Sequence, residues 1–254
     1  MGIPFVILFF YMNKTFPSYS FLPKYHSHIT NWHGHIPFSA DLISLTQPNL
    51  IVELGTHYGD SYFSFCQACD SFSNETRLFA IDHWEGDSYS GYYGSSVYKE
   101  IYNYNKLHYN HRSKLIRDTF DNSVSQFADK SIDILHIDGS HDYSSVMNDF
   151  SNWLPKVSKG GVILFHDTQI LERNFGVHKF WSEIASSYPH MEFTPSCGLG
   201  VLINTEKLLS TDVLFPLFQS TSFQSIKEYY EECADRITRH IESTPSIPID
   251  NFKT

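Results

Sequence analysis

The sequence is poor in basic residues and in cysteine. It holds 18 Lys and Arg against 28 Asp and Glu, which gives a formal net charge of -10. Such a chain repels phosphates, so we expect no nucleic-acid partner. Of its four cysteines only Cys66 and Cys69 are close in sequence. No second Cys or His pair at zinc-finger spacing accompanies them, so we expect a buried helix face rather than a zinc site or disulfide framework, and a cytoplasmic location.

The sequence also has no apolar run long enough to predict a membrane span. Residues 3–12 are apolar but are interrupted by Pro4, whereas a spanning helix needs about 20 residues. No Lys or Arg precedes this run, as a signal peptide would require. We therefore expect no membrane span and assign residues 1–25 to an N-terminal extension, of which residues 1–11 need not belong to the mature protein.

The dinucleotide fingerprint G-x-G-x-x-G is absent, and a two-glycine turn stands in its place. Residues 51–61 read IVELGTHYGDS, with glycines at 55 and 59. Glycines let a backbone turn approach a ligand closely, and the following helix offers unpaired N–H groups at its start. Glu53 at the strand end suits a cationic or amino-bearing ligand better than a pyrophosphate. S-adenosylmethionine carries both an ammonium and a sulfonium.

From Leu50 onward, short apolar runs alternate with longer amphipathic stretches. This pattern predicts an α/β fold with a mostly parallel seven-stranded sheet and helices on both faces. We expect strands at 50–53, 78–82, 114–116, 132–137 and 162–166, and helices at 61–68, 97–105, 122–127, 143–154 and 177–187. Residues 155–161, PKVSKGG, should end a helix and feed the fifth strand through a glycine turn.

The remaining elements complete one domain. Residues 191–193 and 200–203 flank a turn rich in Pro, Ser, Cys and Gly, which predicts an antiparallel hairpin at the sheet edge. A charged amphipathic helix is expected at 225–241. We assign the domain to residues 26–242 and a flexible tail to residues 243–254.

Asp82 ends the second expected strand, in the run AIDHW. A carboxylate at that point of a Rossmann-like fold is placed to accept hydrogen bonds from both hydroxyls of a ribose. A strand, a glycine turn, a helix and then a strand ending in an acid form a more specific pattern than either half alone. The pattern predicts a nucleoside site.

With these residues the sequence resembles the class I S-adenosylmethionine-dependent methyltransferases. VELGTHYGDS is similar to their first motif and AIDHWEGD to their second. Residues 136–168, HIDGSHDYSSVMNDFSNWLPKVSKGGVILFHDT, look like the branch that includes metal-dependent sugar and macrolide O-methyltransferases and cephalosporin-hydroxylase-like proteins. With GHIPF at 34–38 and YPHMEFTPSCGLGVL at 188–202, the resemblance covers about residues 33–203.

The resemblance implies a Rossmann-like fold that binds S-adenosylmethionine. It implies Glu53, Gly55, Thr56, Gly59 and Ser61 around the methionine part, Asp82 at the ribose, Trp84 against the adenine, and Asp118 or Thr119 at the adenine edge.

Polar residues follow the fourth and fifth expected strands, as DGSH at 138–141 and HDT at 166–168. The carboxyl ends of such strands meet at one edge of the sheet, so Asp138, Asp167 and His166 are candidate ligands of one divalent ion. Mg²⁺ suits the two carboxylates, and Mn²⁺ or Fe²⁺ would accept His166 more readily. The alternative for His166 is a core histidine bonded to a backbone carbonyl. Many relatives carry two adjacent acids where this sequence has His166 and Asp167.

His141 is the candidate general base, with Asp138 as the second catalytic residue. A sugar hydroxyl is a poor nucleophile, and a positioned imidazole or a nearby cation favours its ionised form. The resembling sugar methyltransferases have a histidine three residues after a metal-binding aspartate, the spacing of Asp138 and His141.

These patterns favour an O-methyltransferase acting on a small or sugar-like hydroxyl acceptor, with metal assistance. Two alternatives stay open: a metal-dependent hydrolase or hydroxylase on the same fold, and a non-catalytic partner in polysaccharide assembly. Residues 83–96 form either a lid or a surface loop, and Trp32, His33 and His35 are expected near the mouth of the site. The expected partner is a small molecule or glycan, and a homo-oligomeric state is left open.

Overall fold

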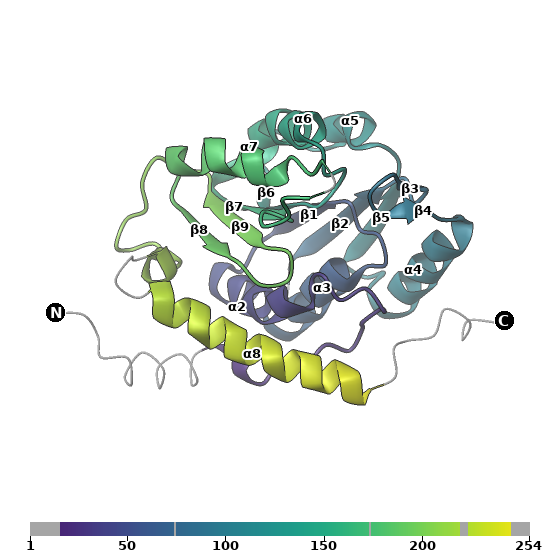
Figure 1. The fold of residues 1–254 in the computed structure, drawn as a ribbon, viewed down its shortest axis with the longest axis horizontal. Helices are drawn as coiled ribbons and strands as arrows, with labels where there is room; N and C mark the ends of the chain where they lie inside the picture. The colour runs from purple at the N-terminus through teal and green to yellow at the C-terminus, as the bar shows by residue number, and fades with distance from the viewer. Residues whose placement is uncertain (1–15, 74, 173, 219–222, 245–254) are drawn as a thin grey trace.

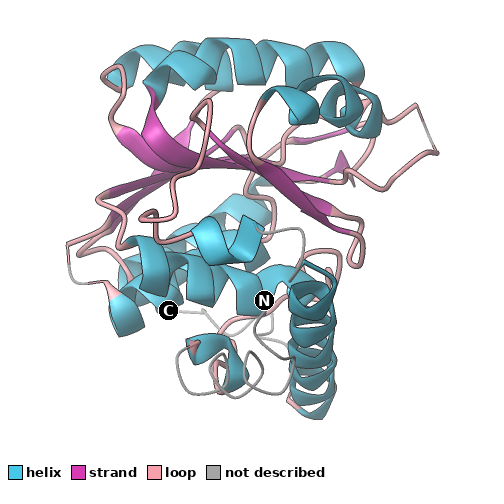
Figure 2. Ribbon diagram, turned by 90° about the vertical axis from the view of Figure 1, so that its left-hand side faces the viewer, coloured by secondary structure: helices cyan, strands magenta, loops and turns pink. Residues whose placement is uncertain are grey.

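The computed structural model describes residues 16–73, 75–172, 174–218 and 223–244. Within them a seven-stranded sheet lies between two layers of helices (Figures 1 and 2). The strands are β1 Leu50–Leu54, β2 Arg77–Asp82, β5 Ser113–Arg117, β6 Ile132–Ile137, β7 Val157–His166, β8 His190–Phe193 and β9 Leu199–Ile203. Their order across the sheet is β5-β2-β1-β6-β7-β9-β8. The α/β class and the seven-stranded sheet are thereby confirmed.

Helices α5, α6 and α7 lie on one face of the sheet, and α2, α3, α4 and α8 lie on the side of the other (Figure 1). The helices are α2 Ile36–Thr46, α3 Asp60–Phe72, α4 Ser95–His108, α5 Phe120–Ser123, α6 Tyr143–Trp153, α7 Val177–Ile184 and α8 Phe223–Ser243. Neighbouring strand residues alternate between the two layers: Ile51 packs in the α2 and α3 cluster, and Val52 in the α6 and α7 cluster. Burial on both faces explains why the central strands are almost wholly apolar.

Five strands, β5, β2, β1, β6 and β7, pair in parallel, and the last two strands turn back. β7 pairs antiparallel with β9, and β9 with β8, so the predicted edge hairpin is confirmed. The carboxyl ends of β1, β2, β6 and β7 therefore share one edge, where the loops that follow them meet. Cys66 and Cys69 lie buried on α3, as expected, and neither is in a disulfide.

The glycine turn predicted at residues 155–161, before the fifth strand, is wrong. β7 already begins at Val157, so most of residues 155–161 belong to the strand. Its pairing with β6 shifts register between Ile132 and Ile134, and Gly160 adopts a φ of 80°. A bulge of this kind admits extra residues into a strand without ending it.

Residues 16–25 pack against the domain. Phe21 and Tyr25 are buried in the hydrophobic core, and Ser18 is fully buried beside Asp41 of α2. The expected charged helix is α8, which contacts α2. Among the described residues, no helix is both long and apolar enough to cross a membrane.

Candidate active site

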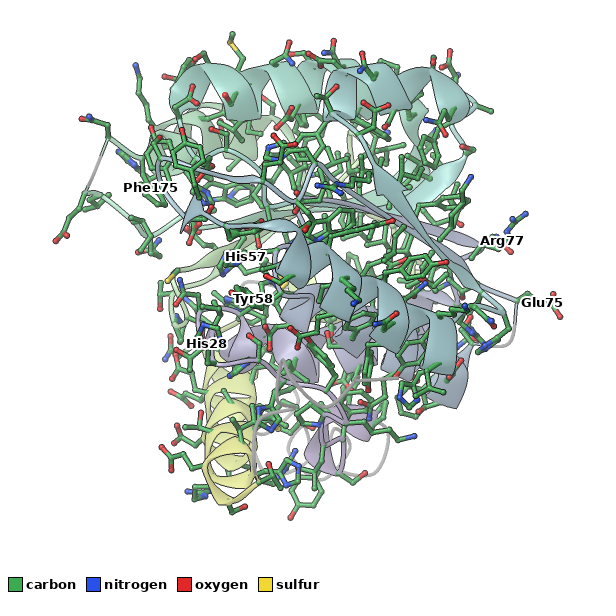
Figure 3. All side chains as sticks on the ribbon, turned by 90° about the vertical axis from the view of Figure 1, so that its right-hand side faces the viewer. His28, His57, Tyr58, Glu75, Arg77 and Phe175 are labelled. Carbon is green, nitrogen blue, oxygen red and sulfur yellow. The ribbon has the colours of Figure 1, made fainter. Side chains whose placement is uncertain are left out.

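A cavity of about 1060 Å³ opens at the carboxyl edge of the parallel strands. It is lined by residues from six stretches of chain, 28–32, 55–61, 82–93, 119–121, 138–149 and 166–175, and by Cys197. Figure 3 shows His28, His57 and Tyr58 together below Phe175, on the opposite side of the molecule from Arg77 at the start of β2. Gly55, Asp82 and Asp138 all line this one cavity, as the sequence patterns require.

The turn after β1 needs its two glycines. Gly55 has a φ of 88°, and a Cβ there would lie 2.0 Å from the backbone oxygen of Asp138. Gly59 has a φ of 85°, directly before α3, where a Cβ would meet the ring of Phe63 at 2.8 Å. A side chain at either position would clash in a backbone region that favours glycine. The close approach at Gly55 brings the β1 turn against the loop that follows β6.

Asp82 holds the β1 turn and still faces the cavity. Its Oδ2 accepts hydrogen bonds from the backbone N–H groups of Thr56 and His57, both at 2.9 Å, and its Oδ1 accepts one from Trp84 at 2.6 Å. A carboxylate offers about four lone-pair sites. Asp82 lines the cavity with its side chain 10% exposed, so it can accept a further hydrogen bond from a ligand.

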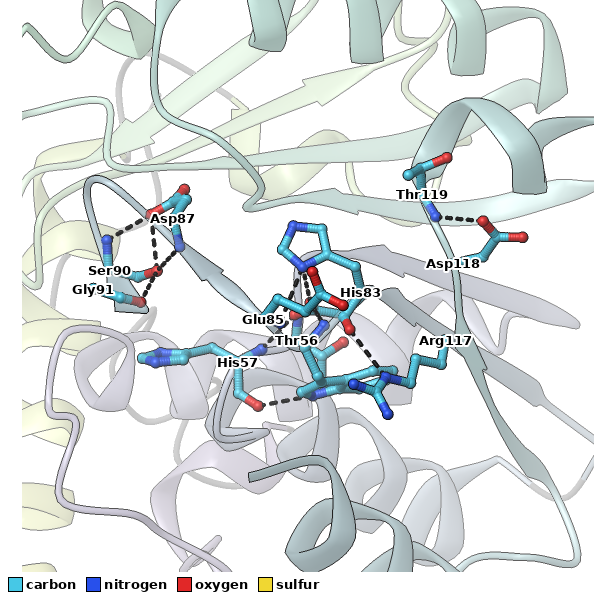
Figure 4. A network of polar contacts seen from close by, with 12 residues as sticks. Thr56, His57, His83, Glu85, Asp87, Ser90, Gly91, Arg117, Asp118 and Thr119 are labelled. Atoms are coloured by element: carbon cyan, nitrogen blue, oxygen red, sulfur yellow. Dashed lines mark hydrogen bonds and ion pairs between the residues drawn. The ribbon is translucent and has the colours of Figure 1, made fainter. Parts of the chain in front are cut away.

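The loop after β2 folds over this turn. It contains the short hairpin of β3 Gly86–Asp87 and β4 Gly91–Tyr92. Arg117 donates to the backbone oxygen of His83, and Asp87 accepts hydrogen bonds from Ser90 (Figure 4). The loop is therefore tied to the sheet at its start and closed on itself at its tip.

The structure brings some of the expected cofactor residues to the cavity and leaves others away from it. Gly55, Thr56, Gly59, Ser61, Asp82 and Thr119 line it. Glu53, Trp84 and Asp118 are not among the lining residues.

Glu53, Trp84 and Asp118 are kept out of the cavity lining for different reasons. Glu53 is fully buried and its Oε2 lies 2.8 Å from Nδ1 of His136 on β6; burial raises the pKa of Glu53. The Trp84 indole is also fully buried and donates to the backbone oxygen of His57. Asp118 is partly exposed and accepts hydrogen bonds within its own loop, from the Thr119 N–H and from Asn122. Glu53 and Trp84 thus act as supports beneath the cavity wall.

Three polar side chains come together beside the turn: Asp138, His141 and Asp167. One potential ligand atom of each lies within 4.8 Å of the others, and His141 Nδ1 lies 3.1 Å from Asp167 Oδ2. The loop after β6 supplies Asp138 and His141, and the loop after β7 supplies Asp167, whose φ is 63°. Two carboxylates and an imidazole at this spacing form a donor set for Mg²⁺ or Mn²⁺.

The structure groups His141 with Asp138 and Asp167, whereas the sequence predicted His166 as the third candidate ligand. His166 Nδ1 lies 3.3 Å from Asp138 Oδ1 and 3.4 Å from Asp167 Oδ1. Its Nε2 lies 3.0 Å from the backbone oxygen of Ser196. Burial would lower the pKa of His166, but the carboxylates of Asp138 and Asp167 outweigh it and raise the pKa well above its usual range. Both nitrogens of His166 thus lie within reach of acceptor oxygens, so in this arrangement neither directs a free lone pair toward a metal.

An aromatic wall stands next to the three polar residues. The His141 ring stacks on Phe175 with centroids 4.6 Å apart and an interplanar angle of 6°. Tyr89, from the loop after β2, meets His141 at 5.6 Å and Phe175 at 5.1 Å, both edge-on. Sequence patterns did not single out Phe175, because the segment after β7 has no periodicity that indicates its contacts.

Of the aromatic residues expected at the mouth, only Trp32 lines the cavity. Its Nε1 donates to Nε2 of His136 at 3.3 Å. His33 is buried against Asp60, with Nε2 2.8 Å from Oδ1. His35 lies beside the backbone oxygen of Ser196, and burial lowers the pKa of His35 to about 3. His33 and His35 therefore fasten the segment before α2 to the domain.

Comparison with known proteins agrees with this architecture. Residues 52–168 match the family described as a methyltransferase domain. An uncharacterized protein of Sinorhizobium fredii (strain NBRC 101917 / NGR234), y4gI, is 44% identical over 171 residues, which are 67% of this chain and 19% of that protein. The uncharacterized protein R132 of Acanthamoeba polyphaga mimivirus is 38% identical over 66 residues, 25% of this chain and 30% of that protein. The chain thus spans less than a third of either relative.

A solved structure shares the fold. A candidate caffeoyl-CoA O-methyltransferase of Staphylococcus aureus superposes with a TM-score of 0.52 at 16% identity, covering 80% of this chain and 92% of that chain. At this identity the likeness concerns the fold alone.

Proposed function

We propose that the chain is an S-adenosylmethionine-dependent O-methyltransferase with a small or sugar-like hydroxyl acceptor, a proposal supported by the match of residues 52–168 to a methyltransferase-domain family. The observation that carries the proposal is the single cavity that joins the Gly55 turn, Asp82 and the group of Asp138, His141 and Asp167. A donor site and a proton-accepting site lie side by side in it, as methyl transfer requires.

The donor half of the cavity suits the cofactor. The turn at Gly55 and the start of α3 at Ser61 would receive the methionine part, because the backbone can approach it closely and a helix start offers N–H groups to its carboxylate. Asp82 would accept hydrogen bonds from the ribose hydroxyls. Asp82 also shapes the Gly55 turn through its backbone contacts, so one residue positions both parts of the cofactor.

The second half suits proton removal from an acceptor hydroxyl. Asp167 Oδ2 lies 3.1 Å from Nδ1 of His141, which favours the tautomer with its hydrogen on Nδ1 and leaves the lone pair on Nε2 to accept the proton. As the acceptor oxygen bonds to the methyl carbon, the bond from that carbon to sulfur breaks and S-adenosylhomocysteine leaves. Stacking on Phe175 holds the imidazole in one plane during this step.

The same residues fit a divalent cation. Asp138 and Asp167 would hold Mg²⁺ or Mn²⁺, and the charge of the bound ion would favour the ionised form of an acceptor hydroxyl. His166 Nδ1 lies 3.3 Å from an oxygen of Asp138 and 3.4 Å from an oxygen of Asp167, so it competes with a cation for both carboxylates. We therefore expect weaker metal binding than in a site with two adjacent acids at this point.

The charge of the cavity supports an acceptor without phosphate groups. Among the described residues that line it are seven aspartates and no Lys or Arg. A phosphate entering this cavity would meet repulsion and find no basic side chain. The wall of Tyr89, Phe175 and His141 offers flat faces to a sugar or an aromatic ring.

Calorimetry with S-adenosylhomocysteine tests the proposal. We expect micromolar affinity, and we expect Asp82→Ala to weaken it at least about tenfold because a hydrogen bond to a charged group is lost. Asp118→Ala is the matched control, because the side chain of this acid is not part of the cavity lining and accepts hydrogen bonds from its own loop, and it should bind like the wild type. Melting curves of both variants establish that they fold.

Other outcomes separate the alternatives. A folded wild-type protein that binds neither cofactor form would rule out the methyltransferase and favour a metal-dependent hydrolase or hydroxylase. Cofactor binding without methyl transfer to any glycan would favour a non-catalytic partner in polysaccharide assembly. Turnover unchanged by a chelator would remove the metal from the proposal and leave the His141 base in place.

A further inference from the structure

Three hydrogen-bonded side chains lead from the cavity wall into the core: Trp32, His136 and Glu53. Trp32 lines the cavity and is 4% exposed, whereas His136 and Glu53 are fully buried. The indole Nε1 of Trp32 donates to Nε2 of His136 at 3.3 Å, and Nδ1 of His136 lies 2.8 Å from Oε2 of Glu53. A side chain that a ligand can touch is thereby linked to the centre of the sheet.

These contacts determine which nitrogen of His136 carries the hydrogen. An indole N–H can only donate, so Nε2 of His136 must offer its lone pair and the hydrogen must lie on Nδ1. Glu53 is then the acceptor at the end of the chain. Because Glu53 and His136 are partners in the register of β1 and β6, the strands hold this pair in place. The orientation of the Trp32 indole is therefore set by two side chains of the core.

Three aromatic rings also pack edge-on against the Trp32 indole. The rings of His35, Phe65 and His136 lie with centroids 5.7, 5.4 and 5.6 Å away, at interplanar angles of 75°, 70° and 66°. Edge-on contacts of this kind are favourable, and with the hydrogen bond they hold the indole in one orientation. A buried acid and histidine cost free energy that an apolar pair would not, so packing alone does not account for them.

On one side, Trp32 adjoins the acceptor half of the cavity. The backbone oxygen of Asn31, the residue before it, lies 3.3 Å from Nε2 of His166. Nδ1 of the same histidine lies 3.3 Å from Asp138 Oδ1. Trp32 is thus one residue and one side chain away from the group of acids proposed to act on the acceptor.

On the other side, Trp32 adjoins the donor half. Its partner His136 and the acid Glu53 lie two residues before Asp138 and Gly55, respectively. At Gly55 a Cβ would lie 2.0 Å from the backbone oxygen of Asp138, so the turn after β1 and the loop after β6 touch directly beyond this pair. Trp32 therefore borders the place where the two halves of the cavity meet.

The methyl group and the positively charged sulfur of the proposed donor belong at this junction, because the methyl must pass from one half to the other. Aromatic rings attract such cations, and the indole does so most strongly. We infer that Trp32 is a specificity-determining residue that distinguishes S-adenosylmethionine from its product by contact with the sulfonium, and that His136 and Glu53 position it. The inference rests on the proposed function, because it takes the donor to be S-adenosylmethionine.

Calorimetry without acceptor tests the role of Trp32. It compares the affinities for S-adenosylmethionine and S-adenosylhomocysteine, which differ only in the methyl group and the charge on sulfur. We expect Trp32→Leu to lower the affinity for the charged form, relative to the uncharged one, by about three- to thirtyfold, the range of cation–π contacts away from water. Trp181→Phe is the control and should keep the wild-type ratio, because Trp181 is also 4% exposed but packs in the α6 and α7 cluster.

Two variants of His136 test its positioning role. In His136→Leu the indole loses its acceptor, and the ratio of affinities should fall in the same direction as in Trp32→Leu. In His136→Gln the amide oxygen can accept from the indole, so the ratio should stay within about twofold of the wild type. NMR spectra of protein labelled at the tryptophan indole nitrogens give a second readout. The indole signal that is missing from Trp32→Phe should move upfield in His136→Leu and keep its position in His136→Gln.

An unchanged ratio of affinities in Trp32→Leu would overturn the role of Trp32 while leaving the cofactor assignment intact. An equal fall in Trp181→Phe would do the same, since a general loosening of the core would then explain both. Failure of the wild type to bind either ligand would instead refute the proposed function and this inference with it. If Trp32→Leu does not fold, the wild type still decides: its Trp32 indole signal should shift more with S-adenosylmethionine than with S-adenosylhomocysteine, and equal shifts would contradict the inference.

Discussion

His141 is the residue on which the proposed proton transfer depends. Asp167 fixes its Nδ1 and Phe175 its ring plane. We predict that His141→Ala lowers the rate of methyl transfer by about 10² to 10⁴, the usual contribution of a general base. Affinity for S-adenosylhomocysteine should change little, because the donor half of the cavity is kept. Single-turnover rates and calorimetry on the same preparations measure the two effects.

His83→Ala provides the comparison for this experiment. His83 also lines the cavity, but its side chain is 48% exposed and it has no contact with the three polar residues in the described structure. It should transfer methyl groups at close to the wild-type rate. Equal rates in the wild type and His141→Ala would mean that another group removes the proton.

A site residue can be predicted from the sequence when its position at the end of a strand is enough to place it in the cavity. Gly55, Asp138 and Asp167 directly follow strands and Asp82 ends one, so the fold alone brings all four to the cavity. The direction of a side chain depends on its tertiary neighbours, which a strand position does not reveal. Glu53 faces His136 across β1 and β6, so its charge is buried in a pair. The role of His166 could not be predicted for the same reason, because its partner, the backbone oxygen of Ser196, lies 30 residues away in the sequence.

At the scale of elements, the loop after β2 closes one side of the site. Within this loop, the Tyr89 ring contacts the rings of His141 and Phe175. We predict that Tyr89→Ala raises the KM for the acceptor roughly three- to tenfold, the range expected for lost aromatic contacts. Affinity for S-adenosylhomocysteine should stay the same, because Asp82 and the Gly55 turn are untouched. Steady-state kinetics with acceptor varied at saturating cofactor gives the KM.

Tyr92→Ala isolates the effect of position within this loop. Tyr92 lies in β4 of the same loop but is 81% exposed. Its loss should leave the KM unchanged. A similar rise in both variants would indicate that the loop as a whole was disturbed, and no rise in either would show that the loop takes no part in acceptor binding.

The hairpin of β8 and β9 was predictable as an element, but its contribution to the site was not. Alternating apolar runs around a turn of Pro, Ser, Cys and Gly indicate paired strands. In the structure Ser196, Cys197 and Gly198 all have positive φ values, of 52°, 69° and 90°. This backbone presents the Ser196 oxygen to His166 and the Gly198 oxygen to the N–H of Asp167. Backbone acceptors of this kind leave no signature in residue types.

At the scale of the whole molecule, local patterns predicted the layers but not what holds distant segments together. The sheet and its helices follow from periodicity along 50–203, whereas residues 16–25 and α8 show no motif that pairs them. They meet at Asp41 of α2. Asp41 accepts hydrogen bonds from the Ser18 N–H at 2.8 Å and from the Tyr230 hydroxyl at 2.9 Å. One buried carboxyl thus joins the segment before α2 to the last helix.

This junction should make the stability of the protein depend on pH. Burial of Asp41 outweighs its hydrogen bonds and raises the pKa of Asp41 from 3.8 to about 6, so the folded state binds the proton more tightly than the unfolded state. The resulting stabilisation is complete below about pH 4 and is lost as the pH rises through 6. A shift of about two pKa units corresponds to about 3 kcal/mol.

Urea unfolding of the wild type and Asp41→Asn between pH 4 and pH 7 measures this contribution, because other titrating groups affect both proteins alike. The free energy of unfolding of the wild type, relative to that of the variant, should fall by about 3 kcal/mol over this range. Parallel curves would show that the Asp41 carboxyl titrates alike in the folded and unfolded chain. The expected relative fall would show that the proton on the Asp41 carboxyl, which contacts both α8 and the segment before α2, contributes to the stability of the fold.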